Sequence, residues 1–304
     1  MKSGDEVWVA GEVLIDLIPT KDGVPTPIVG GGGANTAKAL ARLGIKTFFI
    51  DGISRDEYGA LARKELEESG IDLKYSNVSD KPTATAIVMI APDGGATYKF
   101  SLAGTATFDF NQSWLPKGEP RVLHVGTLAT IIEPGATALF HWAKEIPAPK
   151  VFDPNVRPSV LEDKVRYREI VEQWFTISNV IKLSEDDLFW LYPAAKNIDD
   201  AIAIARSFLR NQTRLVVITR GAEGVIGVTH EQTISVPGVR TEVVDTVGAG
   251  DTVGAILVES IYNHGLDYLV TEGLQGVLSR AAKAAAITCS RPGAQPPTAA
   301  ELLL

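Results

Sequence analysis

The stretch Asp245-Thr246-Val247-Gly248-Ala249-Gly250-Asp251-Thr252 is followed by an apolar run, 253–260, that predicts a helix. Its small residues allow a tight backbone turn whose N–H groups stay open at a helix start, where they suit an anion such as a phosphate. Asp251 stands at the mouth of this predicted anion hole. A free aspartate titrates at ~3.9, so its carboxylate is ionised near neutral pH and can accept a proton from an attacking hydroxyl. A plain N-cap role for Asp251 also stays open, and the two interpretations do not exclude each other.

A second glycine loop precedes a predicted helix near the N-terminus. Four consecutive glycines, 30–33, weaken any regular element. They lead into 34–44, where apolar residues recur at spacings of three and four before a closing glycine. We interpret the loop as a close approach of backbone to a small polar ligand, with Asn35 and Asp16 bonding its hydroxyls. A flexible hinge is the alternative.

Composition and charge narrow the classes of partner. The chain has 304 residues, of which 45% are hydrophobic, a net charge of -8, and no cluster of basic residues. This disfavours nucleic acid and anionic membranes as partners. The charged N-terminus does not resemble a signal peptide, and no apolar run is long enough to span a bilayer, so we expect a soluble, cytoplasmic protein. One cysteine, Cys289, excludes a disulfide framework or a cysteine-based zinc site within one chain.

The order of predicted elements indicates an α/β fold. From residue 121 onward, strands alternate with helices, which implies a parallel sheet covered on both faces. The predicted strands are 121–125, 150–153, 180–183 and 214–219, and the predicted helices between them are 133–144, 159–175, 184–190 and 198–210. A hairpin at 224–236 and helices at 251–263, 267–288 and 298–303 complete the chain.

Residues that follow predicted strands are candidate ligand contacts, because open α/β sheets bind ligands at the carboxyl ends of their strands. They are Asp153 to Arg157, Lys182 with Glu185, and Thr219 to Gly221. A turn, a first-turn helix residue and a loop are the respective alternatives. The chain has no G-x-x-x-x-G-K-[ST] loop, no dinucleotide fingerprint, no G-x-S-x-G elbow and no metal-ligand spacing among its four histidines.

The two glycine loops carry a resemblance to a known family. The sequence resembles the ribokinase, or phosphofructokinase B, family of sugar kinases in Gly30 to Ala37, continuing to Arg42-Leu43-Gly44, and in Asp245 to Thr252. The resemblance covers essentially the whole chain. It implies one domain over 1–304, with a doubly wound, mainly parallel sheet, helices on both faces, and a β-lid formed by about 13–30 and 83–107. The turn Pro92-Asp93-Gly94-Gly95 predicts a hairpin within that lid.

The resemblance also implies a reaction, in which the γ-phosphoryl group of ATP passes to a primary hydroxyl of a sugar with the help of Mg²⁺. Asp251 matches the catalytic base, and Gly248, Ala249 and Gly250 match the anion hole. The implied contacts to sugar hydroxyls are Asp16, Gly31, Gly32 and Asn35. The implied contacts to the nucleotide and its magnesium are Lys182, Glu185, Thr219, Gly221 and Gly224, and the implied K⁺ loop contains Asp245 and Val247.

The acceptor is predicted from three stretches that look most like bacterial fructokinases: 11–19, 124–128 and 153–157. They favour D-fructose as the substrate and fructose 6-phosphate as the product. A 2-keto-3-deoxygluconate kinase, in which Arg157 would meet the substrate carboxylate, is the alternative within the family, followed by a ribokinase. A non-catalytic sugar-binding or regulatory protein is the alternative of another class. We expect a homodimer, because an exposed lid edge favours pairing.

Overall fold

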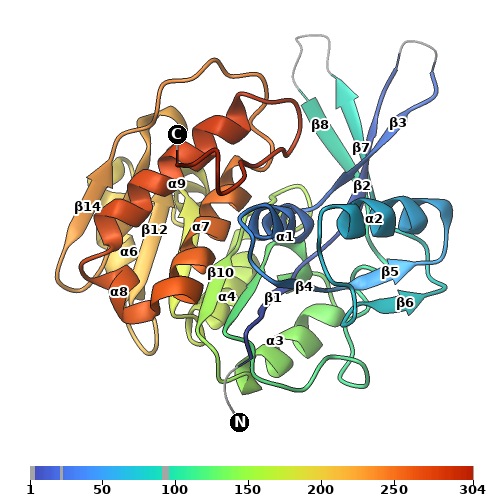
Figure 1. The fold of residues 1–304 in the computed structure, drawn as a ribbon, viewed down its shortest axis with the longest axis horizontal. Helices are drawn as coiled ribbons and strands as arrows, with labels where there is room; N and C mark the ends of the chain where they lie inside the picture. Colours follow the sequence, from blue (N-terminus) through green and yellow to red (C-terminus); the bar gives the residue numbers. More distant parts are fainter. Residues whose placement is uncertain (1–3, 21–22, 91–95, 304) are drawn as a thin grey trace.

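The computed structural model describes residues 4–20, 23–90 and 96–303. Among them, an eight-stranded sheet runs in the order β14-β13-β12-β11-β10-β9-β1-β4 (Figure 1). The strands are β1 (Val7–Ala10), β4 (Thr47–Ile50), β9 (Val122–Gly126), β10 (Lys150–Asp153), β11 (Val180–Ser184), β12 (Leu215–Thr219), β13 (Val225–Val228) and β14 (Thr233–Val236). All neighbours pair in parallel except β12–β13 and β13–β14, which are antiparallel.

Both faces of this sheet are buried, which explains its nearly continuous apolar strands. In β1, Val7 and Val9 belong to one core cluster, whereas Trp8 and Ala10 belong to the other. Trp8 stacks on Trp142, with ring centroids 6.0 Å apart. Strand residues therefore alternate between two cores, one on each face.

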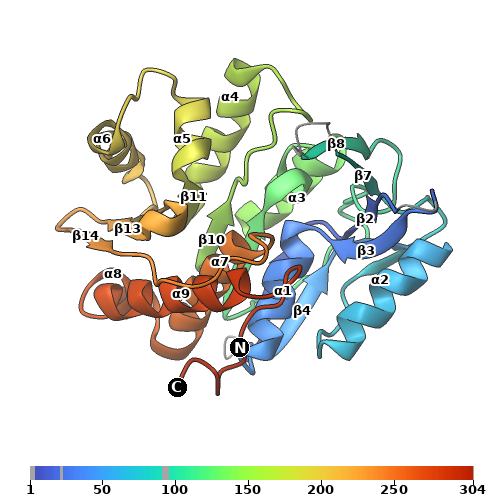
Figure 2. The same cartoon turned by 90° about the horizontal axis from the view of Figure 1, so that it is seen from above.

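Helices cover both faces, as the doubly wound prediction requires (Figure 2). One layer consists of α3 (Gly135–Glu145), α4 (Lys164–Phe175), α5 (Glu185–Leu191) and α6 (Ile198–Phe208). The other consists of α1 (Gly32–Arg42), α7 (Ala249–His264), α8 (Leu266–Val270) and α9 (Leu274–Cys289). Helix α7 packs against both α1 and α9. The helices that follow the two predicted glycine loops, α1 and α7, therefore pack against each other.

Three predicted helices differ from the structure. The segment 298–303 forms turns rather than a helix. The predicted helix 267–288 is divided into α8, which ends at Val270, and α9, which begins at Leu274. In the turn between them the Gly273 N–H donates to the Tyr268 carbonyl, and the Tyr268 ring lies 2.2 Å from an ideal Cβ on Gly273, so the turn packs closely only with glycine there. The helix predicted from 159 begins at Lys164, where the Asp163 carboxylate accepts hydrogen bonds from the backbone of Val165 and Arg166.

A separate four-stranded sheet projects from the core (Figure 1). It contains β2 (Leu14–Ile18), β3 (Thr26–Gly30), β7 (Thr85–Ile90) and β8 (Ala96–Ser101) in the order β3-β2-β7-β8. These strands fall in the two segments predicted for the lid, whereas the predicted turn at 92–95 lies outside the described residues. Helix α2 (Glu57–Glu68) packs against β2 and β3, and the short strands β5 (Gly52–Ser54) and β6 (Asn77–Ser79) form a parallel pair that was not predicted.

Within the described ranges, no helix has both the length and the apolar character needed to cross a membrane.

Candidate active site

The glycine turn at residue 248 starts helix α7. Gly248 is the N-cap residue, has a φ of 78°, and so lies in the left-handed region that glycine tolerates. Asp251 is the third residue of α7, so the interpretation of Asp251 as the N-cap is wrong. The resemblance places Ala249 in the anion hole. Its N–H instead donates to the Thr246 carbonyl at 3.3 Å, inside the turn. The N–H groups of Gly250 and Asp251 lie in the first turn, where no intrahelical acceptor exists.

A pocket of about 420 Å³ lies in front of this turn. It brings together residues from the lid, the glycine loop of α1 and the carboxyl ends of the strands. The predicted site residues that line it are Asp16, Gly31, Gly32, Asn35, Arg157, Lys182, Val247, Gly248, Gly250 and Asp251. The predicted residues that do not line it are Ala249, Glu185, Thr219, Gly221, Gly224 and Asp245.

Asp251 is a buried residue that lines the pocket. Asn35 Nδ2 donates to Asp251 Oδ2 at 2.9 Å, and Asn35 Oδ1 is buried without a partner among the described residues. Burial and the neighbouring Asp153 raise the pKa of Asp251 to about 6, against the opposing effects of Lys182, Asn35 and Arg157. The ordinary pKa assumed for Asp251 from the sequence is therefore too low. The carboxylate remains ionised at neutral pH, while Asn35 leaves one acceptor for a ligand hydroxyl.

A buried ion pair stands beside Asp251. Lys182 Nζ lies 2.7 Å from Asp153 Oδ2, and both side chains are almost fully buried. The ammonium also lies against the glycine turn, since an ideal Cβ on Gly250 would be 2.9 Å from Lys182 Nζ. Burial alone would lower the pKa of Lys182, but Asp153, with smaller contributions from Asp187 and Asp251, raises it. Lys182 thus supplies a fixed positive charge next to the anion hole.

Apart from Lys182, the predicted nucleotide residues lie at the same edge of the sheet but outside the pocket. Ser184 and Thr219 are opposite each other where β11 and β12 end. Glu185 begins α5 and forms an ion pair with Arg220 at 3.5 Å. Gly221 follows with a φ of 51°. Together these residues continue the edge beyond Lys182.

The predicted cation loop is held by backbone hydrogen bonds. Asp245 Oδ1 accepts from the Val247 N–H at 3.0 Å, and Asp245 Oδ2 accepts from the Gly293 N–H at 2.9 Å. Asp245 therefore fixes the loop that precedes α7. Its role toward a monovalent cation stays a prediction.

Asp16, in the lid strand β2, and Arg157, in the segment after the core strand β10, line the same pocket. Burial raises the pKa of Asp16 to about 6, and the Arg157 guanidinium opposes that rise. Arg157 comes from the segment after β10, and Asp16 from β2, so core and lid each supply one charged group. Both line the same pocket as Asp251, and their contact with the acceptor stays a prediction.

Sequence reasoning missed Glu12 and Thr127, which also line the pocket. Glu12 is 2% exposed and its carboxylate accepts hydrogen bonds from Thr127 Oγ1, Gly32 N and Ala129 N. The available signal was a glutamate two residues after the end of a buried strand. Thr127 carried no such signal, because its position depends on a backbone φ of 61°.

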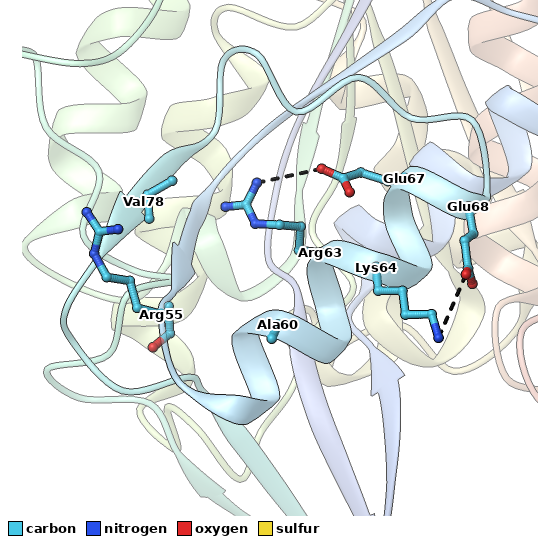
Figure 3. A pocket seen from close by; sticks show the side chains of 8 residues that line it. Arg55, Ala60, Arg63, Lys64, Glu67, Glu68 and Val78 are labelled. Carbon is cyan, nitrogen blue, oxygen red and sulfur yellow. Dashed lines mark ion pairs between the residues drawn. The ribbon is translucent and has the colours of Figure 1, made fainter.

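A second hollow, of about 750 Å³, lies on α2 and beside β5 and β6 (Figure 3). Its charged side chains pair along the helix, with Arg63 3.8 Å from Glu67 and Lys64 3.9 Å from Glu68. None of the predicted site residues lines it. The pocket at Asp251, which most of the predicted residues line, is therefore the candidate active site.

Comparisons with known proteins identify the family and the fold of the chain. The profile described as pfkB family carbohydrate kinase matches residues 5–301. A fructokinase of Rhizobium leguminosarum bv. trifolii is 34% identical over 274 residues, which are 88% of this chain and 82% of that protein. The structure of a Vibrio cholerae O395 fructokinase with fructose, ADP and calcium superposes with a TM-score of 0.88, at 25% identity and 98% coverage of both chains. Aminoimidazole riboside kinase from Salmonella enterica, bound to aminoimidazole riboside and an ATP analogue, shares the fold, with a TM-score of 0.84 at 24% identity and 98% coverage of both chains.

Proposed function

This chain belongs to the pfkB family of carbohydrate kinases, and we propose that it transfers the γ-phosphoryl group of ATP to D-fructose, forming fructose 6-phosphate. The observation that carries the proposal is the meeting of Asp251, Asn35 and Lys182 in one pocket beneath the lid. The three side chains correspond to a base, a hydroxyl contact and a fixed positive charge. The likeness to fructokinases favours fructose as the acceptor.

Asp251 acts as the general base in this proposal. Its ionised carboxylate accepts the proton of the sugar hydroxyl as that oxygen attacks phosphorus. Asn35 Nδ2 orients the carboxylate, and the unpartnered Asn35 Oδ1 accepts a hydrogen bond from a second sugar hydroxyl. The pocket residues thus fix the acceptor while the proton moves to Asp251.

The transferring phosphoryl group lies between Lys182 and the first turn of α7. The Lys182 ammonium and the N–H groups of Gly250 and Asp251 stabilise its negative charge. Phosphoryl transfer has a loose transition state, so positioning and charge stabilisation dominate catalysis. The lid covers the acceptor and keeps water from competing for the phosphoryl group.

Mg²⁺ needs only one or two protein carboxylates when it binds with nucleotide phosphates. Among the described residues, no group of three or more His, Cys, Asp or Glu side chains forms a metal cage, and such a cage is not required here. Glu185, at the start of α5, is the carboxylate that we assign to it. Bound there, Mg²⁺ would neutralise phosphate charge, and Thr219, Gly221 and Gly224 would hold the nucleotide.

Arg157 supports a second acceptor of the same class. Its guanidinium reaches the pocket and can pair with a carboxylate in two hydrogen bonds, which fits 2-keto-3-deoxygluconate. This acceptor would use the same base and anion hole. The two candidates therefore differ only in what meets Arg157.

The test is ADP release with ATP and Mg²⁺ over fructose, 2-keto-3-deoxygluconate, ribose, glucose, adenosine and aminoimidazole riboside. We expect the highest kcat/KM with fructose and a product that phosphoglucose isomerase accepts, which places the phosphate on the 6-hydroxyl. A higher kcat/KM with 2-keto-3-deoxygluconate than with fructose would show that this keto acid is the acceptor. Nucleotide binding without turnover on any acceptor would instead support a non-catalytic sugar-binding protein.

A further inference from the structure

One hydrogen bond at the pocket wall, from Thr127 to Glu12, joins two residues that each carry a cost in free energy. The first is the Glu12 carboxylate, which is 2% exposed and accepts three hydrogen bonds but has no ion-pair partner among the described residues. Burial raises the pKa of Glu12 to about 7, although its hydrogen bonds to Thr127, Gly32 and Ala129 oppose the rise. An ionised carboxylate at this position therefore costs folding free energy.

The second feature is the backbone of Thr127. Its φ is 61°, in the left-handed region that a β-branched residue rarely adopts. Thr127 Oγ1 donates to Glu12 Oε2, so the carboxylate holds the residue that carries the strain. Strain of this kind persists where the surrounding structure imposes it, and it concentrates at functional sites.

By bonding Thr127 and Gly32, Glu12 holds two pocket segments close together, the one that contains Thr127 and the glycine loop of α1. Glu12 Oε1 accepts from the Gly32 N–H at 2.9 Å, and the Glu12 carbonyl accepts from the Ala34 N–H at 3.1 Å, so Glu12 also holds the glycine loop of α1. An ideal Cβ on Gly32 would lie 2.4 Å from Thr127 Cγ2 and 3.3 Å from Asp251 Oδ1. The glycine loop, Thr127 and the catalytic carboxylate therefore share one crowded surface.

We propose that Glu12 is a positioning residue for the acceptor, because it joins the glycine loop to Thr127 and so builds the pocket wall that faces the sugar. The inference rests on the proposed function. Glu12 lies between β1 and β2, where the chain passes from the core sheet into the lid. It acts on the acceptor through Gly32 and Thr127, and Lys182 and the nucleotide edge lie outside its hydrogen bonds.

The experiment compares KM for the sugar with KM for ATP in substituted proteins. Glu12→Gln keeps the shape of the side chain but replaces one carboxylate oxygen, an acceptor, by an NH₂ group, a donor. That NH₂ group cannot accept from the donors that the carboxylate faces, which are Gly32 N, Thr127 Oγ1 and Ala129 N. We expect its sugar KM to rise about tenfold or more, as for the loss of a charged hydrogen bond, and its ATP KM to change by less than about twofold. Thr127→Val removes the hydroxyl alone and is expected to give the same result.

Three further variants separate positioning from a general effect on folding. Thr127→Ser keeps the hydroxyl, so its sugar KM should return to within about twofold of the wild-type value. The double variant Glu12→Gln/Thr127→Val should be no worse than Glu12→Gln alone, because Glu12→Gln already disturbs the hydrogen bond that Thr127→Val removes. Glu259→Gln is the matched control: Glu259 is a buried glutamate of α7 that pairs with Arg280 at 2.9 Å outside the pocket, so both KM values should stay unchanged.

The outcomes distinguish the two proposals. If the wild-type protein phosphorylates the sugar and Glu12→Gln has an unchanged sugar KM, or raises both KM values alike, the inference is wrong and the kinase assignment stands. Additive effects of Glu12→Gln and Thr127→Val would also overturn it. If the wild-type protein releases no ADP with any acceptor, the proposed function fails, and the inference fails with it.

Discussion

At the scale of single residues, the environment of Asp251 suits a base better than a structural carboxylate. The side chain is buried, and one of its oxygens accepts from Asn35. Asp153 repels its charge, while Lys182 and Arg157 favour it. These opposing effects leave a carboxylate that is charged at neutral pH yet basic enough to receive a proton.

We expect Asp251→Asn to lower turnover by about 10²- to 10⁴-fold, the usual contribution of a general base. Asparagine keeps the shape of the side chain, so ATP and sugar should still bind with affinities near those of the wild-type protein. Single-turnover kinetics measure the rate of the chemical step, and calorimetric titration with ADP measures nucleotide binding. Wild-type turnover in the variant would refute the assignment of the base.

Activity should depend on pH through the same carboxylate. The pKa of Asp251 is about 6, and only the ionised form accepts a proton, so kcat/KM should fall about tenfold per pH unit below that value. Asp16 titrates in the same range, since its pKa is also about 6. The acid limb should therefore persist in Asp16→Asn. A profile that is flat down to pH 5 in that variant would contradict the role of Asp251.

At the scale of secondary structure elements, two glycines inside helices have opposite roles. Gly33 in α1 packs on the backbone of Gly11, where an ideal Cβ would lie 2.6 Å from the Gly11 carbonyl carbon. Gly276 in α9 has nothing within 4 Å of its ideal Cβ. The first glycine permits contact between α1 and the end of β1, whereas the second only weakens its helix.

We predict that Gly276→Ala raises the free energy of unfolding by about 0.5–1 kcal/mol, the difference in helix propensity. Gly33→Ala should lower it by more than about 1 kcal/mol, because the methyl group forces α1 away from Gly11. Urea denaturation of both variants tests the pair. Equal effects of the two substitutions would show that the contact at Gly33 carries no constraint.

Local sequence signals predicted the strands of the two larger sheets and the two glycine loops, because each depends on a short pattern, but they did not predict β5 and β6. They failed where a distant side chain decides the outcome. The turn that divides the helix predicted over 267–288 packs Gly273 against the Tyr268 ring, and Lys182 pairs with Asp153 from the neighbouring strand. The role of Glu12 was missed for the same reason, since its partner Thr127 lies 115 residues away.

At the scale of the whole molecule, the lid leaves apolar side chains exposed. Ile28 in β3 is 48% exposed and Ile87 in β7 is 39% exposed. In register, Ile28 lies opposite Asp16 and Ile87 opposite Leu17, so the two side chains point to opposite faces of the lid. The sheet ends in the edge strands β3 and β8, and an edge strand is a place where a second copy can pair.

We therefore predict a homodimer that pairs through the lid. Light scattering should give twice the chain mass of 32.5 kDa, and the double variant Ile28→Lys/Ile87→Lys should give the single mass. Lysine at both positions removes apolar area and adds repulsion between copies. A single mass for the unsubstituted protein would exclude this assembly.

The hydrogen bond between Asn35 and Asp251 joins residues that are 216 positions apart. A ribosome adds about 5–20 residues per second, so the glycine loop of α1 is synthesised about 10–40 s before the aspartate that completes it. A nascent chain released before α7 emerges would carry the acceptor contacts but no base. The two halves of the proposed site can therefore meet only after α7 has left the ribosome, and a fragment that ends before α7 cannot contain the whole site.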